Sequence, residues 1–84
     1  MENSVIVTVR YLCGSEVREQ DFELPYDEPV GPLSVKFFAF MNENGLMPYS
    51  RNYYYFYSGK RRLNSDKTLR ENLIYDGNIL DISL

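Results

Sequence analysis

The chain opens with apolar and polar residues in regular alternation, the two-residue period of a half-buried β-strand. In residues 4–12, positions 5, 7 and 9 are valine, position 11 is tyrosine, and most of the residues between them are polar. Residues 17–24 alternate in a similar way, and Gly14-Ser15 separates the two segments. Glycine in the first position of a two-residue loop favours a tight hairpin. We therefore predict two antiparallel strands, with Val7 opposite Phe22 and one shared apolar face.

The next segment changes to a helical period, in which apolar residues recur three and four positions apart. Gly45 can adopt the left-handed conformation that commonly ends a helix. We predict a helix from Pro32 to Asn44. Its inward side chains are expected to be Val30, Leu33, Phe37, Phe40 and Met41.

Five consecutive aromatic residues, 53–57, predict a third strand over residues 52–57 because aromatic side chains favour strands. Alternate members of a half-buried strand belong to the core. We place positions 53, 55 and 57 in the core, so that Tyr54 and Phe56 face outward. Residues 58–60 then form a turn, and residues 61–63 form a short fourth strand.

The last third of the chain contains three local signals. Thr68 and Glu71 have the spacing of a capping box, which predicts one helical turn with Leu69 pointing inward. Asp76-Gly77 is a tight-turn dipeptide. The alternation that follows, from position 80 to 84, predicts a final strand. We expect this strand to lie parallel to the first, in the sheet order second, first, last, third.

Composition limits what the protein can be. With 84 residues, 44% of them hydrophobic, we expect one globular domain over residues 1–84. A single cysteine, Cys13, excludes an internal disulfide, and the chain opens with neither a signal peptide nor a membrane-length apolar segment. We expect a cytoplasmic protein that does not insert into a membrane.

This order of elements resembles the ubiquitin-like β-grasp, an α+β fold with one helix across a mixed sheet. Residues 56–63 are similar to the I-F-A-G-K-Q-L segment of ubiquitin with one residue inserted, and residues 67–80 match the spacing of its R-T-L segment. Within these proteins the chain most resembles the bacterial YukD/EsaB group, through residues 21–25, Pro29-Val30 and residues 76–80. That resemblance implies an accessory or regulatory component of a type VII secretion system, with a protein partner from that system.

The resemblance also implies a binding face. By the same alignment Phe56 falls at the central isoleucine of ubiquitin's apolar patch, with Tyr54, Arg10, Thr8 and Asp81 around it. An aromatic centre with a polar rim is typical of protein interfaces. Two alternatives remain open: the rings shield the sheet, or they pair two copies of the chain in a homodimer.

The residue types give little support for catalysis, a metal or a cofactor. The chain has no histidine, the commonest general base and zinc ligand. Cys13 at a hairpin end has no reliable activating neighbour and is interpreted as an incidental small residue. Glu19, Asp21 and Glu23 project in parallel from one strand and do not form a cage for a cation. We expect a non-enzymatic protein without a cofactor.

Two other classes of function have some support in the residue pattern. Lys60, Arg61 and Arg62 form a basic turn near the aromatic strand and are grouped with Lys67 and Arg70, a combination that can bind single-stranded nucleic acid. The net charge of −3 makes an ordinary solvated turn the better interpretation. A ubiquitin-like modifier needs a glycine tail beyond its last strand, whereas the given sequence ends at Leu84 near the end of that strand. We therefore expect the protein not to be conjugated to targets.

Overall fold

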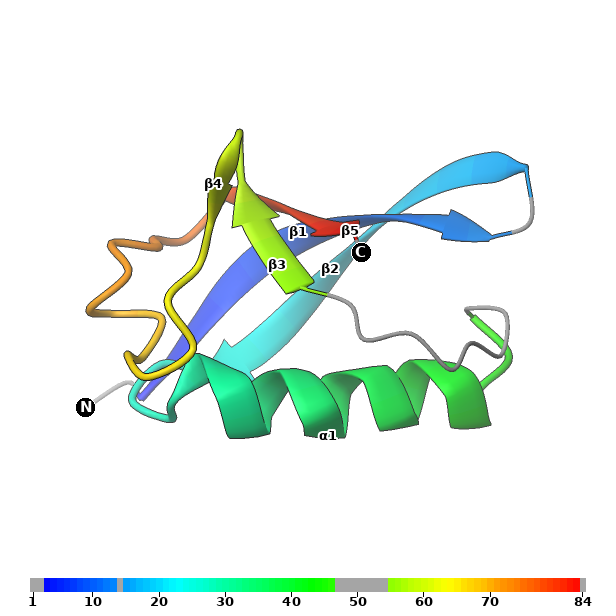
Figure 1. Ribbon diagram of the computed structural model, residues 1–84. Helices are drawn as coiled ribbons and strands as arrows, with labels where there is room; N and C mark the ends of the chain where they lie inside the picture. Colours follow the sequence, from blue (N-terminus) through cyan, green and yellow to red (C-terminus); the bar gives the residue numbers. More distant parts are fainter. Residues whose placement is uncertain (1–2, 14, 47–54, 84) are drawn as a thin grey trace.

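A computed structural model describes residues 3–13, 15–46 and 55–83 of the chain. It contains a five-stranded sheet with one helix across one face (Figure 1). The sheet order is β2-β1-β5-β3-β4, and β5 runs parallel to β1. This confirms the predicted order of the strands. The elements are β1 (Ser4–Cys13), β2 (Glu16–Pro25), α1 (Val30–Glu43), β3 (Tyr55–Ser58), β4 (Arg61–Arg62) and β5 (Ile79–Ser83).

The first hairpin has the predicted register. Val7 pairs with Phe22 and Val5 with Leu24. The side chains of Val5, Val7, Val9 and Tyr11 are buried, while Ile6 is 53% exposed on the opposite face. Alternation in the sequence was therefore sufficient to define both the strands and their faces.

The helix begins two residues earlier than predicted, at Val30. Two backbone hydrogen bonds account for this start: Val30 N–H donates to the Lys67 carbonyl at 2.9 Å, and Gly31 N–H donates to the Ser65 carbonyl at 3.0 Å. Donors that would need a side-chain cap are thus satisfied by a distant segment. Local sequence cannot reveal such partners.

The end of the helix confirms the predicted left-handed cap. Gly45 has φ of 66°. Its N–H donates to the Asn42 carbonyl, and Leu46 N–H donates to the Met41 carbonyl at 2.9 Å. These two bonds form a Schellman motif, which explains why the helix stops at Glu43.

The predicted helix stripe is confirmed for four of its members and wrong for Phe40. Phe40 is 45% exposed. It lies beside the stripe, edge-on to Phe22 with ring centroids 6.3 Å apart. Since β2 is the last strand on that side of the sheet, no strand that the structure describes lies beyond it to cover the Phe40 ring. The buried hydrophobic core consists of Val5, Val7, Val9, Tyr11, Leu24, Val30, Leu33, Phe37, Met41, Phe56, Leu63, Leu69, Ile74 and Leu80.

The third strand presents its faces the other way round from the prediction. Phe56 is 1% exposed and belongs to the core, whereas Tyr55 and Tyr57 are half-buried. The hairpin pairs Tyr57 with Arg62, and Leu63 N–H donates to the Phe56 carbonyl at 3.0 Å. The turn between β3 and β4 therefore contains two residues, Gly59 and Lys60, instead of the three predicted. Phe56 and Leu63 lie opposite each other and point inward together.

The segment before β5 is held together as predicted. Glu71 N–H donates to Thr68 Oγ1 at 3.0 Å, and Thr68 N–H donates to Glu71 Oε1 at 3.1 Å, which confirms the capping box. Leu69 is fully buried. Gly77 has φ of 85° in the predicted turn. In the same segment, the buried Asn72 side chain forms hydrogen bonds with the backbone of residues 64 and 68, which fix the path of the loop.

The core assignment makes a quantitative prediction. Phe37 is 6% exposed and packs against the rings of Phe22, Phe38 and Phe56, with ring centroids 4.9–5.9 Å apart. We expect Phe37→Ala to lower the free energy of unfolding by about 3–5 kcal/mol. Phe40→Ala, which removes an exposed ring from the same helix, should cost about 1 kcal/mol or less. Urea denaturation measures both, and equal losses would mean that the inward face of α1 is misassigned.

Candidate protein-binding face

The face of the sheet opposite α1 is not covered by any element that the structure describes (Figure 1). We call it the outer face. The register of the strands defines its residues, since side chains of one face alternate along each strand. They are Val17, Glu19, Asp21 and Glu23 on β2, Ser4, Ile6, Thr8, Arg10 and Leu12 on β1, Ile79, Asp81 and Ser83 on β5, Tyr55 and Tyr57 on β3, and Arg62 on β4.

Two tyrosines form the aromatic part of the outer face. Tyr55 and Tyr57 are neighbours on one side of β3, and both are half-buried. The guanidinium of Arg62 lies 4.4 Å from the centroid of the Tyr55 ring. This cation–π contact covers part of that ring. In the strand register Tyr57 pairs with Asp81 of β5 and with Arg62 of β4, so residues of opposite charge flank it on the two neighbouring strands.

An ion pair crosses the middle of the outer face. Arg10 Nε lies 2.6 Å from Asp81 Oδ1, and Arg10 Nη2 lies 3.0 Å from Asp81 Oδ2. The hydrogen bond to Asp81 raises the pKa of the Arg10 guanidinium further. Next to this pair, Thr8 Oγ1 donates to Asp21 Oδ1 at 2.6 Å. The polar groups between the strands are thus hydrogen-bonded to one another and fix the side chains in place.

The structure describes four of the five residues predicted for the site, and their role in binding stays a prediction. Thr8, Arg10 and Asp81 lie on the outer face, as expected. Phe56 does not: the prediction that it forms the exposed centre is wrong, because Leu63 opposite it directs the ring into the core. Tyr54 lies outside the described residues.

Tyr55 and Tyr57, which the sequence placed in the core, take the position of the aromatic centre. One signal could have found them. A two-residue Gly59-Lys60 turn pairs Phe56 with the apolar Leu63 and Tyr57 with the charged Arg62. With a two-residue turn, the polarity of the β4 residues identifies the inner and outer faces of β3.

The basic turn does not present its arginines together. Arg62 lies over Tyr55 on the outer face, whereas Arg61 Nη2 donates to the Asn72 carbonyl at 2.8 Å. Lys60 is exposed at the turn itself. Arg70, which the sequence groups with them, makes a two-point ion pair with Asp27 at 2.7 and 3.2 Å. Three of these four cations are therefore engaged within the chain.

The charges divide the outer face into zones. β2 contributes three carboxylates at one edge, Arg62 contributes a cation near the other, and the tyrosines lie between them. Tyrosine offers both apolar surface and a hydroxyl at small entropic cost. Such a face can bind a complementary protein surface through its centre and orient that surface through its charges.

The 14-residue α1, the one helix among the described residues, is too short to cross a membrane.

The fold agrees with solved structures of ubiquitin-like domains. The ubiquitin-like domain of the Mycobacterium tuberculosis type VII secretion system protein EccD1 superposes with a TM-score of 0.72 and 22% identity, covering 96% of this chain and 98% of that one. A chain of the MycP5-free ESX-5 inner membrane complex gives 0.71 and 21%, covering 98% of this chain. The present chain spans 21% of the length of that protein. Caldiarchaeum subterraneum ubiquitin gives 0.69 and 15%, covering 94% of this chain and 90% of its own.

No protein-family model matches the chain, and the comparison with curated proteins finds no match. The fold is therefore assigned by structure. The chain has a ubiquitin-like fold, with one helix packed on a mixed five-stranded sheet. The structures to which it is similar include a ubiquitin-like domain of a type VII secretion system protein.

The Arg70–Asp27 pair makes stability depend on pH. The hydrogen bond from Arg70 lowers the pKa of the Asp27 carboxyl below its ordinary value of 3.8. Because the folded state has the lower pKa, the pair stabilises fully above that ordinary value, and its contribution is lost as the pH falls through the lowered pKa. We expect Asp27→Asn to destabilise the protein near neutral pH, and the difference from wild type to shrink in acid. Urea titrations at about pH 6 and about pH 2 measure this, and an equal difference at both would contradict it.

Proposed function

We propose that the protein is a non-catalytic, protein-binding module that acts as an accessory or regulatory component of a bacterial type VII secretion system, of the YukD/EsaB kind. Its partner is another protein of that system, and it acts in the cytoplasm. The outer face carries the binding part of this proposal. It presents two half-buried tyrosines flanked by opposite charges on the side of the sheet that α1 leaves open.

The secretion part of the proposal is supported by structural similarity. The EccD1 ubiquitin-like domain matches nearly the whole of both chains, so the likeness extends beyond a shared supersecondary motif. A second neighbour is a chain of the ESX-5 inner membrane complex. A module of this size and shape suits a docking role, because its rigid sheet holds the interface residues in fixed positions.

The non-catalytic part of the proposal is supported by the residue types on the outer face. Its carboxylates are either paired with Arg10 or hydrogen-bonded by Thr8 and Ser4, or they are exposed on β2. The chain has no histidine to act as a general base near neutral pH.

The proposal predicts that Tyr57 is an anchor. Tyr57→Ala should cost about 1 kcal/mol of stability or less, because the ring is only half-buried. Capture of secretion-system components from cells that carry the system should fall by about tenfold or more. Phe40→Ala removes an exposed ring from the opposite side of the molecule and should leave capture unchanged.

Capture is measured with tagged protein and mass spectrometry, and folding with circular dichroism on the same samples. Complementation of a deletion strain should follow the same pattern, with secretion restored by Phe40→Ala and not by Tyr57→Ala. If Tyr57→Ala captures the same components, the outer face is not the binding face. If it converts a dimer of the chain into a monomer without affecting capture, the tyrosines pair two copies instead.

A further inference from the structure

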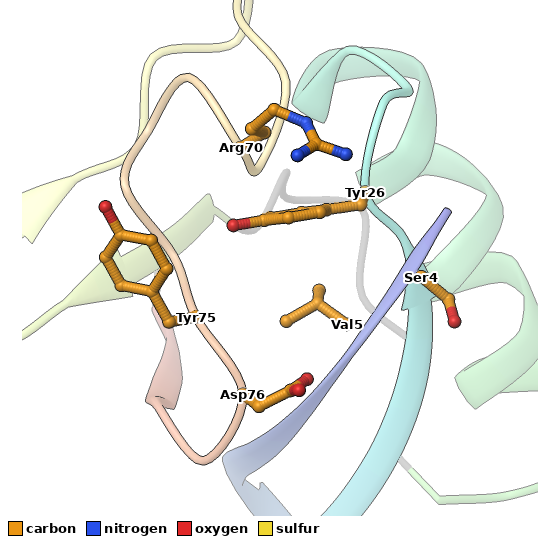
Figure 2. Close-up of a pocket in the computed structure, with 6 residues that line it drawn as sticks. All are labelled: Ser4, Val5, Tyr26, Arg70, Tyr75 and Asp76. Atoms are coloured by element: carbon orange, nitrogen blue, oxygen red, sulfur yellow. The ribbon is translucent and has the colours of Figure 1, made fainter. Parts of the chain in front are cut away.

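A second surface feature lies at the opposite end of β1 from the hairpin turn. It is a hollow of about 560 Å³ between the start of β1, the loop after β2 and the turn before β5 (Figure 2). Of the outer-face residues, only Ser4, which donates to Glu23 there, also lines the hollow. Its lining residues are Ser4, Val5, Tyr26, Arg70, Tyr75 and Asp76.

Backbone hydrogen bonds fix the walls of the hollow. Tyr26 N–H donates to the Asn3 carbonyl at 2.8 Å, and Arg70 N–H donates to the Tyr26 carbonyl at 3.2 Å. On the other side, Gly77 N–H donates to the Ile6 carbonyl at 2.9 Å. Three segments far apart in the sequence are thus held together, so the hollow is formed before any ligand arrives.

Arg70 does not make this hollow a site for an anion. Its guanidinium is paired at two points with Asp27 and lies 4.3 Å from the centroid of the Tyr26 ring. The positive charge is therefore compensated within the chain. Figure 2 shows Arg70 on one side of the Tyr26 ring, with Val5 and Asp76 on the other side. The ring face away from Arg70 borders the hollow.

Asp76 supplies the uncompensated charge. Its Oδ1 accepts a hydrogen bond from Ile6 N–H at 2.9 Å. Among the ion pairs formed by described residues, none includes Asp76. The turn needs neither the charge nor the second oxygen, because asparagine before glycine serves the same turn and offers the same acceptor. The turn thus uses only one oxygen of the Asp76 carboxylate, Oδ1, and does not require the other oxygen or the negative charge.

We propose that the hollow binds the side chain of a lysine or arginine presented by a partner protein. The methylene groups lie over the free face of Tyr26 and beside Val5, and the charged head reaches the second oxygen of Asp76. Tyr75, which is 56% exposed, closes the side of the hollow with its ring and hydroxyl. A carboxylate with aromatic rings around it is the combination that favours an organic cation. The net charge of −3 favours the approach of such a group.

This inference is independent of the secretion assignment and of the outer face. The test is a ¹H–¹⁵N NMR titration of the full chain with three capped peptides: Ac-Gly-Lys-Gly-NH₂, Ac-Gly-Arg-Gly-NH₂ and Ac-Gly-Glu-Gly-NH₂. The two cationic peptides should bind with millimolar affinity and shift the amide resonances of Tyr26, Tyr75 and Gly77. Added salt should weaken this binding. The acidic peptide should not shift them. Butylammonium has the alkylammonium group of a lysine side chain without the peptide backbone. It should bind more weakly than the lysine peptide if the recognised group belongs to a protein.

Matched variants locate the effect. Asp76→Asn keeps the turn and the acceptor for Ile6 N–H but removes the charge. It should lower the affinity for the lysine peptide about tenfold. Asp66→Asn makes the same change at an exposed position outside the hollow and should have no effect. Tyr57→Ala should bind the peptide normally, which separates a failure here from a failure of the outer face. The inference is overturned if Asp76→Asn binds like wild type, if the acidic peptide shifts the same amides, or if the shifts centre on the carboxylates of β2.

Discussion

The burial of Phe56 between the sheet and α1 decides which side chains this protein presents to a partner. Its ring lies 5.5 Å from both Phe37 and Phe38 and is 1% exposed. Because side chains alternate along a strand, an inward Phe56 requires Tyr55 and Tyr57 to face outward. Tyrosine tolerates that position better than phenylalanine, since its hydroxyl stays in water while the ring covers the strands beneath.

Most of the fold could be predicted from sequence because its signals are local. Alternation defined the first hairpin, Gly45 ended the helix, and the Thr68–Glu71 spacing and Asp76-Gly77 defined the approach to β5. The faces of β3 could not be predicted from β3 alone. Five aromatic residues in succession contain no polar member to mark the outer side, so the decision lies with the residues opposite them on β4. The start of α1 depends likewise on a distant carbonyl, that of Lys67.

The same limit applies to charge. In sequence the arginines between positions 61 and 70 suggest a basic surface. In the structure each has a different partner: a backbone carbonyl for Arg61, a tyrosine ring for Arg62 and a carboxylate for Arg70. Carboxylates are distributed unevenly too, since Asp27 and Asp81 are paired and Asp76 is not. Pairing, which composition cannot show, determines which charges remain available to a ligand.

Proton–proton nuclear Overhauser effects measure the orientation of β3 without a partner protein. With Phe56 inward, strong effects should connect its ring to the Leu63 methyl groups and to the rings of Phe37 and Phe38. No effects should connect the Tyr57 ring to α1. Effects from Tyr57 to side chains of α1, with none from Phe56 to the helix, would mean that the two faces of the strand are reversed.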